Sequence, residues 1–174
     1  KTFKVDTLLL AVGLIPYVAL SDNLGIPTSK SRGPVVNNNY QTQLPWFFVA
    51  GNALHIHDLA DDAYFEGEEA GRAASLFING KLKAPTNTLQ VVPGYGINYV
   101  IPNNLELPLN TDELVLKFRP KENYENKRIV VKIDDTVIFK KFFPFLFPSE
   151  LVILKVKKEL LVAGEKLIVE VSDE

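Results

Sequence analysis

The sequence predicts two parts, an α/β segment followed by an all-β sandwich of the immunoglobulin-like type. The chain has 174 residues, of which 47% are apolar and 23% are charged, which is the balance of an ordinary folded protein. In residues 1–80, near-continuous apolar runs of strand length are typical of strands covered on both faces. In residues 89–174, apolar and polar residues alternate, as they do in half-buried strands. This change of period separates the two predicted parts.

The first part begins with a predicted buried strand over residues 5–12. Residues 21–45 are rich in Gly, Asn, Ser and Pro, and we interpret them as mostly connection, with one short helix before Gly25 and one short strand at residues 35–36. Residues 46–50 form a second predicted buried strand. Buried strands of this kind belong to layered α/β sheets.

A helix is predicted after this second strand. Acidic residues favour its start near residues 58–61, and Gly80 is placed to cap its end. Glu68 and Arg72 have the spacing of an ion pair on its surface. Small residues recur at helical spacing and predict a face that approaches a sheet or a ligand closely: Ala60, Ala63, Gly67, Ala70, Gly71 and Ala74.

Residues 81–88 show no apolar period, and we interpret them as a linker between the segment 1–80 and the β domain 89–174. The β domain is expected to hold about seven short strands, a number typical of sandwiches. Asp134 and Asp135 predict a tight hairpin turn. The expected strands cover residues 89–92, 97–101, 114–119, 129–133, 136–142, 151–157 and 166–171.

Charge and composition exclude several classes of function. The net charge is −2 and is shared evenly between the halves, so the sequence shows no basic surface for nucleic acid or an anionic membrane. The chain has no Cys, which excludes disulfides and thiolate metal ligands within it. Its apolar runs are too short to span a bilayer, and no signal peptide is recognisable. We therefore expect a cytoplasmic protein.

Gly51 and Asn52 are the most informative pair, because they stand between a predicted buried strand and a helix. Ligands of α/β sheets bind at this edge. Gly51 would allow a close approach of the backbone, and Asn52 could bond a hydroxyl or phosphate oxygen. The alternative interpretation is a strand turn with a helix cap, and spacing alone leaves both open.

Three stretches carry a resemblance to a known family: residues 5–16 (VDTLLLAVGLIP), residues 47–52 (FFVAGN) and the Gly- and Ala-rich residues 66–74. Together they resemble the end of the two-dinucleotide-binding-domain flavoproteins, the FAD- and NAD(P)-dependent oxidoreductases related to thioredoxin reductase. The resemblance implies that the first part is the end of a Rossmann-like FAD-binding domain. Gly51 and Asn52 match a Gly-Asp pair whose acid bonds the ribityl chain of FAD; Asn52 keeps an acceptor without the charge.

Residues 51–59 look similar to a narrower branch, the FAD oxidoreductases associated with glycerol-3-phosphate dehydrogenase, which carry a similar His-x-His-Asp run and a β extension. By analogy with the wider family, backbone amides near Asp61, Asp62 and Ala63 would face the pyrimidine edge of the flavin. The resemblance thus implies FAD as cofactor, and NAD(P) bound by a domain that this sequence does not contain.

His55 and His57 are the candidate catalytic residues, although the sequence does not identify a catalytic group. Two histidines two residues apart, followed by Asp58, could ligate a metal. The sequence offers no third His, no Cys and no further acid at a recognisable spacing, so we expect no metal. Beside a flavin, one of the two could instead act as acid or base.

No Gly-x-Gly-x-x-Gly phosphate loop occurs in the sequence. We therefore expect the C-terminal fragment of a longer FAD-dependent oxidoreductase that transfers electrons between NAD(P)H and an unidentified acceptor. Its partner would be the remainder of its own polypeptide, a homo-oligomer stays open, and the segment alone would be inactive. The alternative is a non-enzymatic β-sandwich interaction module on an α/β scaffold.

Overall fold

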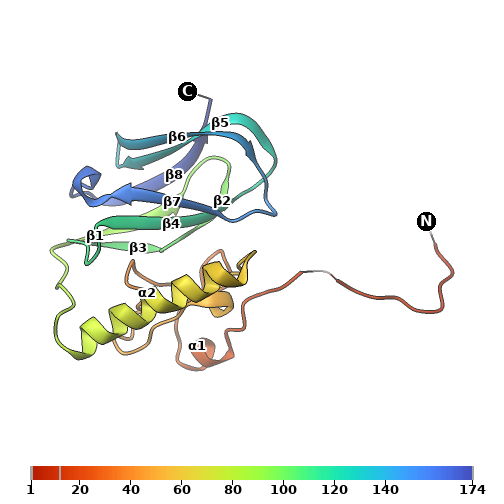
Figure 1. Ribbon diagram of the computed structural model, residues 1–174, viewed down its shortest axis with the longest axis horizontal. Helices are drawn as coiled ribbons and strands as arrows, with labels where there is room; N and C mark the ends of the chain where they lie inside the picture. Colours follow the sequence, from red (N-terminus) through yellow and green to blue (C-terminus); the bar gives the residue numbers. More distant parts are fainter. Residues whose placement is uncertain (1, 12, 174) are drawn as a thin grey trace.

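The computed structural model describes residues 2–11 and 13–173 and places a β sandwich against a helix and its loops (Figure 1). Two α-helices lie in the first part, the short α1 (Ala19–Asn23) and the long α2 (Ala60–Ile78). A single 3-10 turn, η1 (Gly51–Ala53), precedes α2. The short helix predicted before Gly25 is therefore confirmed as α1.

The described part of the chain forms two β-sheets after α2. The larger sheet has the order β3-β1-β8-β5-β6 and the smaller has the order β2-β4-β7. Neighbouring strands are antiparallel except β1 and β8, which are parallel. The strands are β1 (Asn87–Pro93), β2 (Ile97–Ile101), β3 (Asn104–Leu107), β4 (Glu113–Pro120), β5 (Tyr124–Ile133), β6 (Thr136–Leu146), β7 (Val152–Lys157) and β8 (Lys166–Ser172), and η2 (Lys158–Leu160) follows β7.

The alternation of apolar and polar residues explains how the two sheets pack on each other. Leu116 and Phe118 of β4, Ile129 of β5 and Val169 of β8 are fully buried between the two sheets. Because side chains of a strand alternate between its faces, these positions supply one continuous core. The two-sheet β region is confirmed, and the immunoglobulin-like type stays a prediction. Strand β3 was not expected, because four residues are too few to show a period.

The strand predicted at residues 5–12 is wrong for the described residues, since residues 2–11 contain no strand and Val12 lies outside the described part. Leu8, Leu9 and Leu10 are at least 72% exposed. Figure 1 shows this segment running away from the rest of the molecule. A strand needs a neighbour to satisfy its backbone, and the described part of the chain supplies none to this segment.

The other two strands of the first part are also absent. Residues 46–50 make one isolated bridge, between Gln41 and Phe48, instead of a strand. Residues 35–36 belong to no strand, although the Val36 carbonyl accepts hydrogen bonds from the backbone at the start of β3. The apolar run of residues 46–50 is therefore packed mainly by side chains and not by a sheet.

Helix α2 has the predicted limits, and Gly80 follows its end with a φ of 63°, where glycine avoids strain. Its buried face differs from the expected stripe of small residues. Glu66, Ala70 and Ala73 are buried, whereas stripe members such as Gly67 are exposed. The reason is that the β sandwich covers the Glu66 side of the helix (Figure 1). The expected partner of Arg72 is also corrected, because it pairs with Glu69 and not with Glu68.

A small second apolar cluster joins the two parts. Val36, Val49 and Leu54 of the first part pack against Tyr99 and Ile101 of β2. Residues 81–86, between α2 and β1, lie in neither helix nor strand. The first part therefore completes its core only with side chains that the β sandwich provides. Among the described residues, no helix has the length and apolarity that crossing a membrane requires.

We expect the two parts to differ in stability. Residues 88–174 should fold alone with cooperative unfolding, because their core is closed by their own sheets. Residues 1–80 alone should aggregate or stay dynamic, since Val49 and Leu54 would lose Tyr99 and Ile101. Hydrogen exchange on the intact chain should show the slowest amides in β4 and β5 and no protection in residues 2–11. Equal protection of both parts in a monomer would contradict this expectation.

Candidate functional site

A buried carboxylate, Glu66 of α2, lies at the centre of the contact between the two parts. It is 1% exposed. Its Oε1 accepts the backbone N–H of Gly51 at 2.7 Å. Its Oε2 accepts hydrogen bonds from Lys117 Nζ of β4 at 2.5 Å and from His55 Nε2 at 2.9 Å, and His57 Nε2 lies 3.4 Å away. Four chain positions from three segments thus converge on one charged group.

The loop before α2 is shaped to deliver these groups. Gly51 has a φ of 66°, a conformation that glycine adopts without strain. The Asn52 side-chain oxygen accepts the backbone N–H of His57 at 3.0 Å and so closes the loop. The rings of His55 and His57 lie 4.2 Å apart between their centroids. Both imidazoles therefore point to the same side, toward Glu66.

The surroundings of Glu66 keep it ionised. Burial by itself raises its pKa, but the contacts with His55 and His57 and the charge of Lys117 lower the pKa by more, and the result lies well below the usual range. Burial lowers the pKa of His55, and Glu66 offsets this only in part. His55 is therefore neutral near pH 7 and donates its Nε2 proton to the carboxylate, while Lys117 supplies the positive charge.

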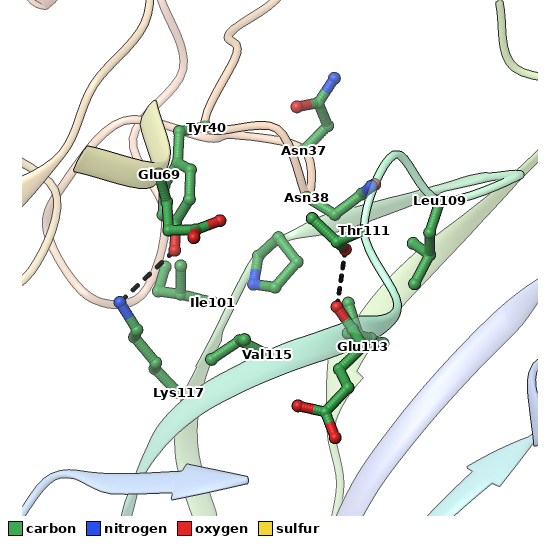
Figure 2. Close-up of a pocket in the computed structure, with 12 residues that line it drawn as sticks. Asn37, Asn38, Tyr40, Glu69, Ile101, Leu109, Thr111, Glu113, Val115 and Lys117 are labelled. Carbon is green, nitrogen blue, oxygen red and sulfur yellow. Dashed lines mark hydrogen bonds between the residues drawn. The ribbon is translucent and has the colours of Figure 1, made fainter. Parts of the chain in front are cut away.

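Tyr40 completes the surroundings of Lys117. Its hydroxyl lies 3.5 Å from Lys117 Nζ, and the two side chains point toward each other in Figure 2. Burial, with the nearby charges of Glu66 and Glu69, raises the pKa of Tyr40 far above its ordinary value. The adjoining cavity measures about 30 Å³. It can hold no more than about two water molecules, so it is not a substrate pocket.

A second group of polar contacts holds the loop before α2 near its end, at Ile56 and Asp58. Arg119, two residues after Lys117 on β4, donates to the Ile56 carbonyl at 3.1 Å and pairs with Asp58. The other oxygen of Asp58 accepts the backbone N–H of Leu151 at 2.6 Å. The outer face of the small sheet therefore holds the loop at two points, Glu66 and Asp58.

The predicted cofactor residues lie at the open end of this arrangement. Asn52 and Asp61 are exposed, and Gly51, Asp62 and Ala63 are partly exposed. The structure brings Gly51 and Asn52 next to each other in η1 and places Asp61, Asp62 and Ala63 in the first turn of α2. The predicted catalytic residues lie elsewhere: His55 is fully buried and His57 nearly so. Their position favours a role in holding the loop.

Within the described residues, His55, His57 and Glu66 form the one group that could hold a metal ion. Lys117 already places a cation on the carboxylate oxygen that such an ion would need. A ligating histidine normally donates its second ring nitrogen to a partner, and Nδ1 of buried His55 has none. The donor set therefore suits an ammonium better than a metal, and the absence of a metal stays a prediction.

Glu66 and Lys117 are the site residues that sequence reasoning missed. From the sequence, Glu66 is interpreted as part of the charged surface of a helix. Lys117 alternates with core residues of β4 and so reads as solvent-facing. It is 6% exposed because the first part covers the outer face of its sheet. No local pattern marks that cover, since it comes from residues far away in the sequence.

Comparisons with known proteins bear on this first part. Residues 1–67 match the model of the family described as Pyridine nucleotide-disulphide oxidoreductase. A stretch of 69 residues is 38% identical to a protein of Schizosaccharomyces pombe (strain 972 / ATCC 24843) named Dihydrolipoyl dehydrogenase, mitochondrial. This stretch is 38% of the present chain and 14% of that relative. No solved structure matches the chain.

The first part of the chain is thus similar to the pyridine nucleotide-disulphide oxidoreductases. The matched residues include Gly51, Asn52 and Glu66 and end before the β sandwich. The similarity thus covers one side of the buried cluster, and Lys117 lies outside it. The narrower branch related to glycerol-3-phosphate dehydrogenase stays a prediction.

Removing one partner of the buried pair should destabilise the chain strongly. Lys117→Met leaves the buried Glu66 carboxyl without its ammonium, so it must take up a proton or draw in water, which should lower the free energy of unfolding by about 3–5 kcal/mol. The double variant Glu66→Gln with Lys117→Met should recover much of this loss, because neither charge remains. Urea unfolding of the four proteins in the cycle measures the coupling. Asp112→Asn, at an exposed ion pair, is the control and should change little.

Stability should also fall with acid. Glu66 and His55 both have lowered pKa values in the folded chain, so the unfolded chain binds more protons. Stability from His55 is therefore lost as pH falls below 6.5, and that from Glu66 as pH falls below 4.5, their ordinary values. Melting temperatures measured from pH 8 to 4 should decline, and His55→Gln should remove the upper part of the decline. A flat profile for the natural chain would contradict the lowered pKa of the buried His55.

Proposed function

We propose that this chain is the FAD-contacting end of a flavin-dependent oxidoreductase that transfers electrons between NAD(P)H and an acceptor. The main support is that the family match covers the Gly51–Asn52 turn. This turn leads into α2, as the flavin-binding turn does in the proposed site. In this proposal Gly51 and Asn52 contact the ribityl region, and the first turn of α2 faces the flavin ring. The NAD(P)-binding part belongs to the remainder of the polypeptide.

The turn has the properties that a flavin chain needs. A Cβ added to Gly51 would meet no atom within 4 Å, so the space outside the turn is open. Asn52 uses its oxygen for the loop, which leaves the exposed amide NH₂ as a donor to a ligand oxygen. The local structure thus offers a polar group at an open backbone turn, and this fits a sugar-like chain of hydroxyls.

The start of α2 also fits. No side chain caps the first turn of this helix, so its backbone N–H groups around Asp61 and Ala63 are free to donate. Those donors, with the positive end of the helix dipole, suit an electron-rich ring edge. FAD, when bound, would accept a hydride; the part of this chain is to bind the cofactor and orient its ring.

The exposed apolar surface of the first part supports a missing neighbour. Leu8 and Leu10 are exposed in the N-terminal segment, and Tyr64 and Phe65 are more than half exposed on α2. Exposed apolar side chains of this size are typical of surfaces that another part of a protein covers. The remaining strands of an FAD-binding sheet would cover them and would give residues 5–12 the partners that a strand needs.

The alternative, a β-sandwich interaction module, has one supporting observation. The edge strand β6 exposes Val137, Phe142 and Phe145, and such edges can pair with another chain. This function would need no flavin anywhere in the polypeptide, so the flavin experiment separates the two. A cytoplasmic location and a homo-oligomer likewise stay predictions.

The full-length protein that contains this sequence should carry FAD, and the 174-residue chain alone should be colourless because it has no phosphate loop. Asn52→Ala in the full-length protein should weaken FAD binding by up to about tenfold, the value of one hydrogen bond of 0.5–1.5 kcal/mol. Absorbance near 450 nm and FAD titration measure both. Asn98→Ala, at an exposed position of β2, is the matched control.

Two results would contradict the proposal. A full-length protein that neither retains nor takes up FAD would overturn the flavoprotein function. An Asn52→Ala variant whose dissociation constant for FAD equals that of the Asn98→Ala control would overturn the ribityl contact alone, and Asn52 would then serve only the loop.

A further inference from the structure

Glu66 connects the β sandwich to the candidate flavin turn through its two oxygens. Oε1 holds the backbone N–H of Gly51, the first residue of the turn, at 2.7 Å. Oε2 is held by Lys117 Nζ of β4 at 2.5 Å. The single side chain of Glu66 therefore connects the β sandwich with the turn. Because Glu66 and Lys117 are both buried, water cannot easily replace the bond between them.

The β sandwich holds the far end of the same loop as well. Arg119 donates to the Ile56 carbonyl and pairs with Asp58, and Asp58 also accepts the backbone N–H of Leu151, just before β7. Lys117 and Arg119 are two residues apart on β4 and lie on one face of that strand. The loop from Gly51 to Asp58 is thus attached to a single rigid strand at both ends.

Lys117 matters most among these contacts because it carries the charge. A carboxylate in a buried position keeps its ionised form only with a cation and several donors. Without Lys117, Glu66 would take up a proton or draw in water. In either case its hydrogen bond to the Gly51 N–H would lose the charge that makes it strong. The turn would then sample other conformations.

We propose that the β sandwich braces the flavin-binding turn and that Lys117 is the positioning residue, acting through Glu66 on Gly51. This inference rests on the proposed flavin function. It assigns a role to the β part, which no family match covers. The brace holds the turn in its binding conformation before the cofactor arrives, so less conformational entropy of the turn is lost when FAD binds.

The test compares Lys117→Met with Lys155→Met in the full-length protein. Lys155 lies on β7, opposite Val115 of β4, and is exposed. Lys117→Met should weaken FAD binding at least fivefold and alter the visible circular dichroism of the bound flavin, at a temperature where the protein is fully folded. Lys155→Met should match the natural protein. If Lys117→Met does not fold, Glu66→Gln with Lys117→Met replaces it, since it keeps an acceptor for Gly51 but loses the brace.

A second measurement needs no flavin. In the 174-residue chain, the Gly51 amide should exchange at least tenfold faster in Lys117→Met, or in the double variant, than in Lys155→Met. The amide of Val131, in the core that the sandwich closes by itself, should speed up by a smaller factor than the Gly51 amide. A purely global effect on stability would instead speed both amides alike.

The outcomes separate the two proposals. A natural full-length protein without FAD overturns the flavin function. A natural protein with FAD, but with equal FAD affinity and flavin spectra in the Lys117 and Lys155 variants, overturns the brace and leaves the flavin function standing. Equal exchange of the Gly51 amide in the two variants also overturns the brace.

Discussion

The need to neutralise one buried carboxylate constrains how the parts of this chain fit together. Glu66 lies where water cannot reach it, and its charge is met by Lys117, His55 and the backbone of Gly51. Gly51 and His55 belong to the loop before α2 and Lys117 belongs to β4, so the cluster ties α2, this loop and the β sandwich to one another. Apolar contacts, such as Leu54 against Tyr99, bring the two parts together. They do not fix the relative orientation of the parts, because apolar packing is weakly directional. The polar cluster fixes that orientation.

The two parts of the chain differ in what they can complete alone. The sandwich closes its own core between two sheets. The first part has one long helix, loops and an exposed apolar segment, and its small cluster depends on Tyr99 and Ile101 of β2. The first part therefore depends on the β sandwich for its packing, and apolar side chains such as Leu8, Leu10 and Tyr64 stay exposed.

The histidines illustrate how position decides role. In a loop beside a helix N-terminus, His55 and His57 suggest acid–base chemistry or a metal. In the folded chain, burial keeps His55 neutral and its proton serves the Glu66 carboxylate. Lys117 provides the positive charge that a metal would otherwise bring. The cluster is therefore suited to holding the Gly51–Asn52 turn in place, while Asn52 is exposed and the start of α2 has no side-chain cap.

The sequence by itself determined the features that depend on local pattern. The alternation in β4, β5 and β8 and the limits of α2 are visible because side-chain period follows backbone geometry. The Gly51–Asn52 turn is visible because its residues carry a family resemblance. Only the tertiary structure decided whether residues 5–11 form a strand, since a strand needs neighbours. It alone made Lys117 a buried partner of Glu66, because burial and charge pairing across 51 positions arise from contacts that no local period records.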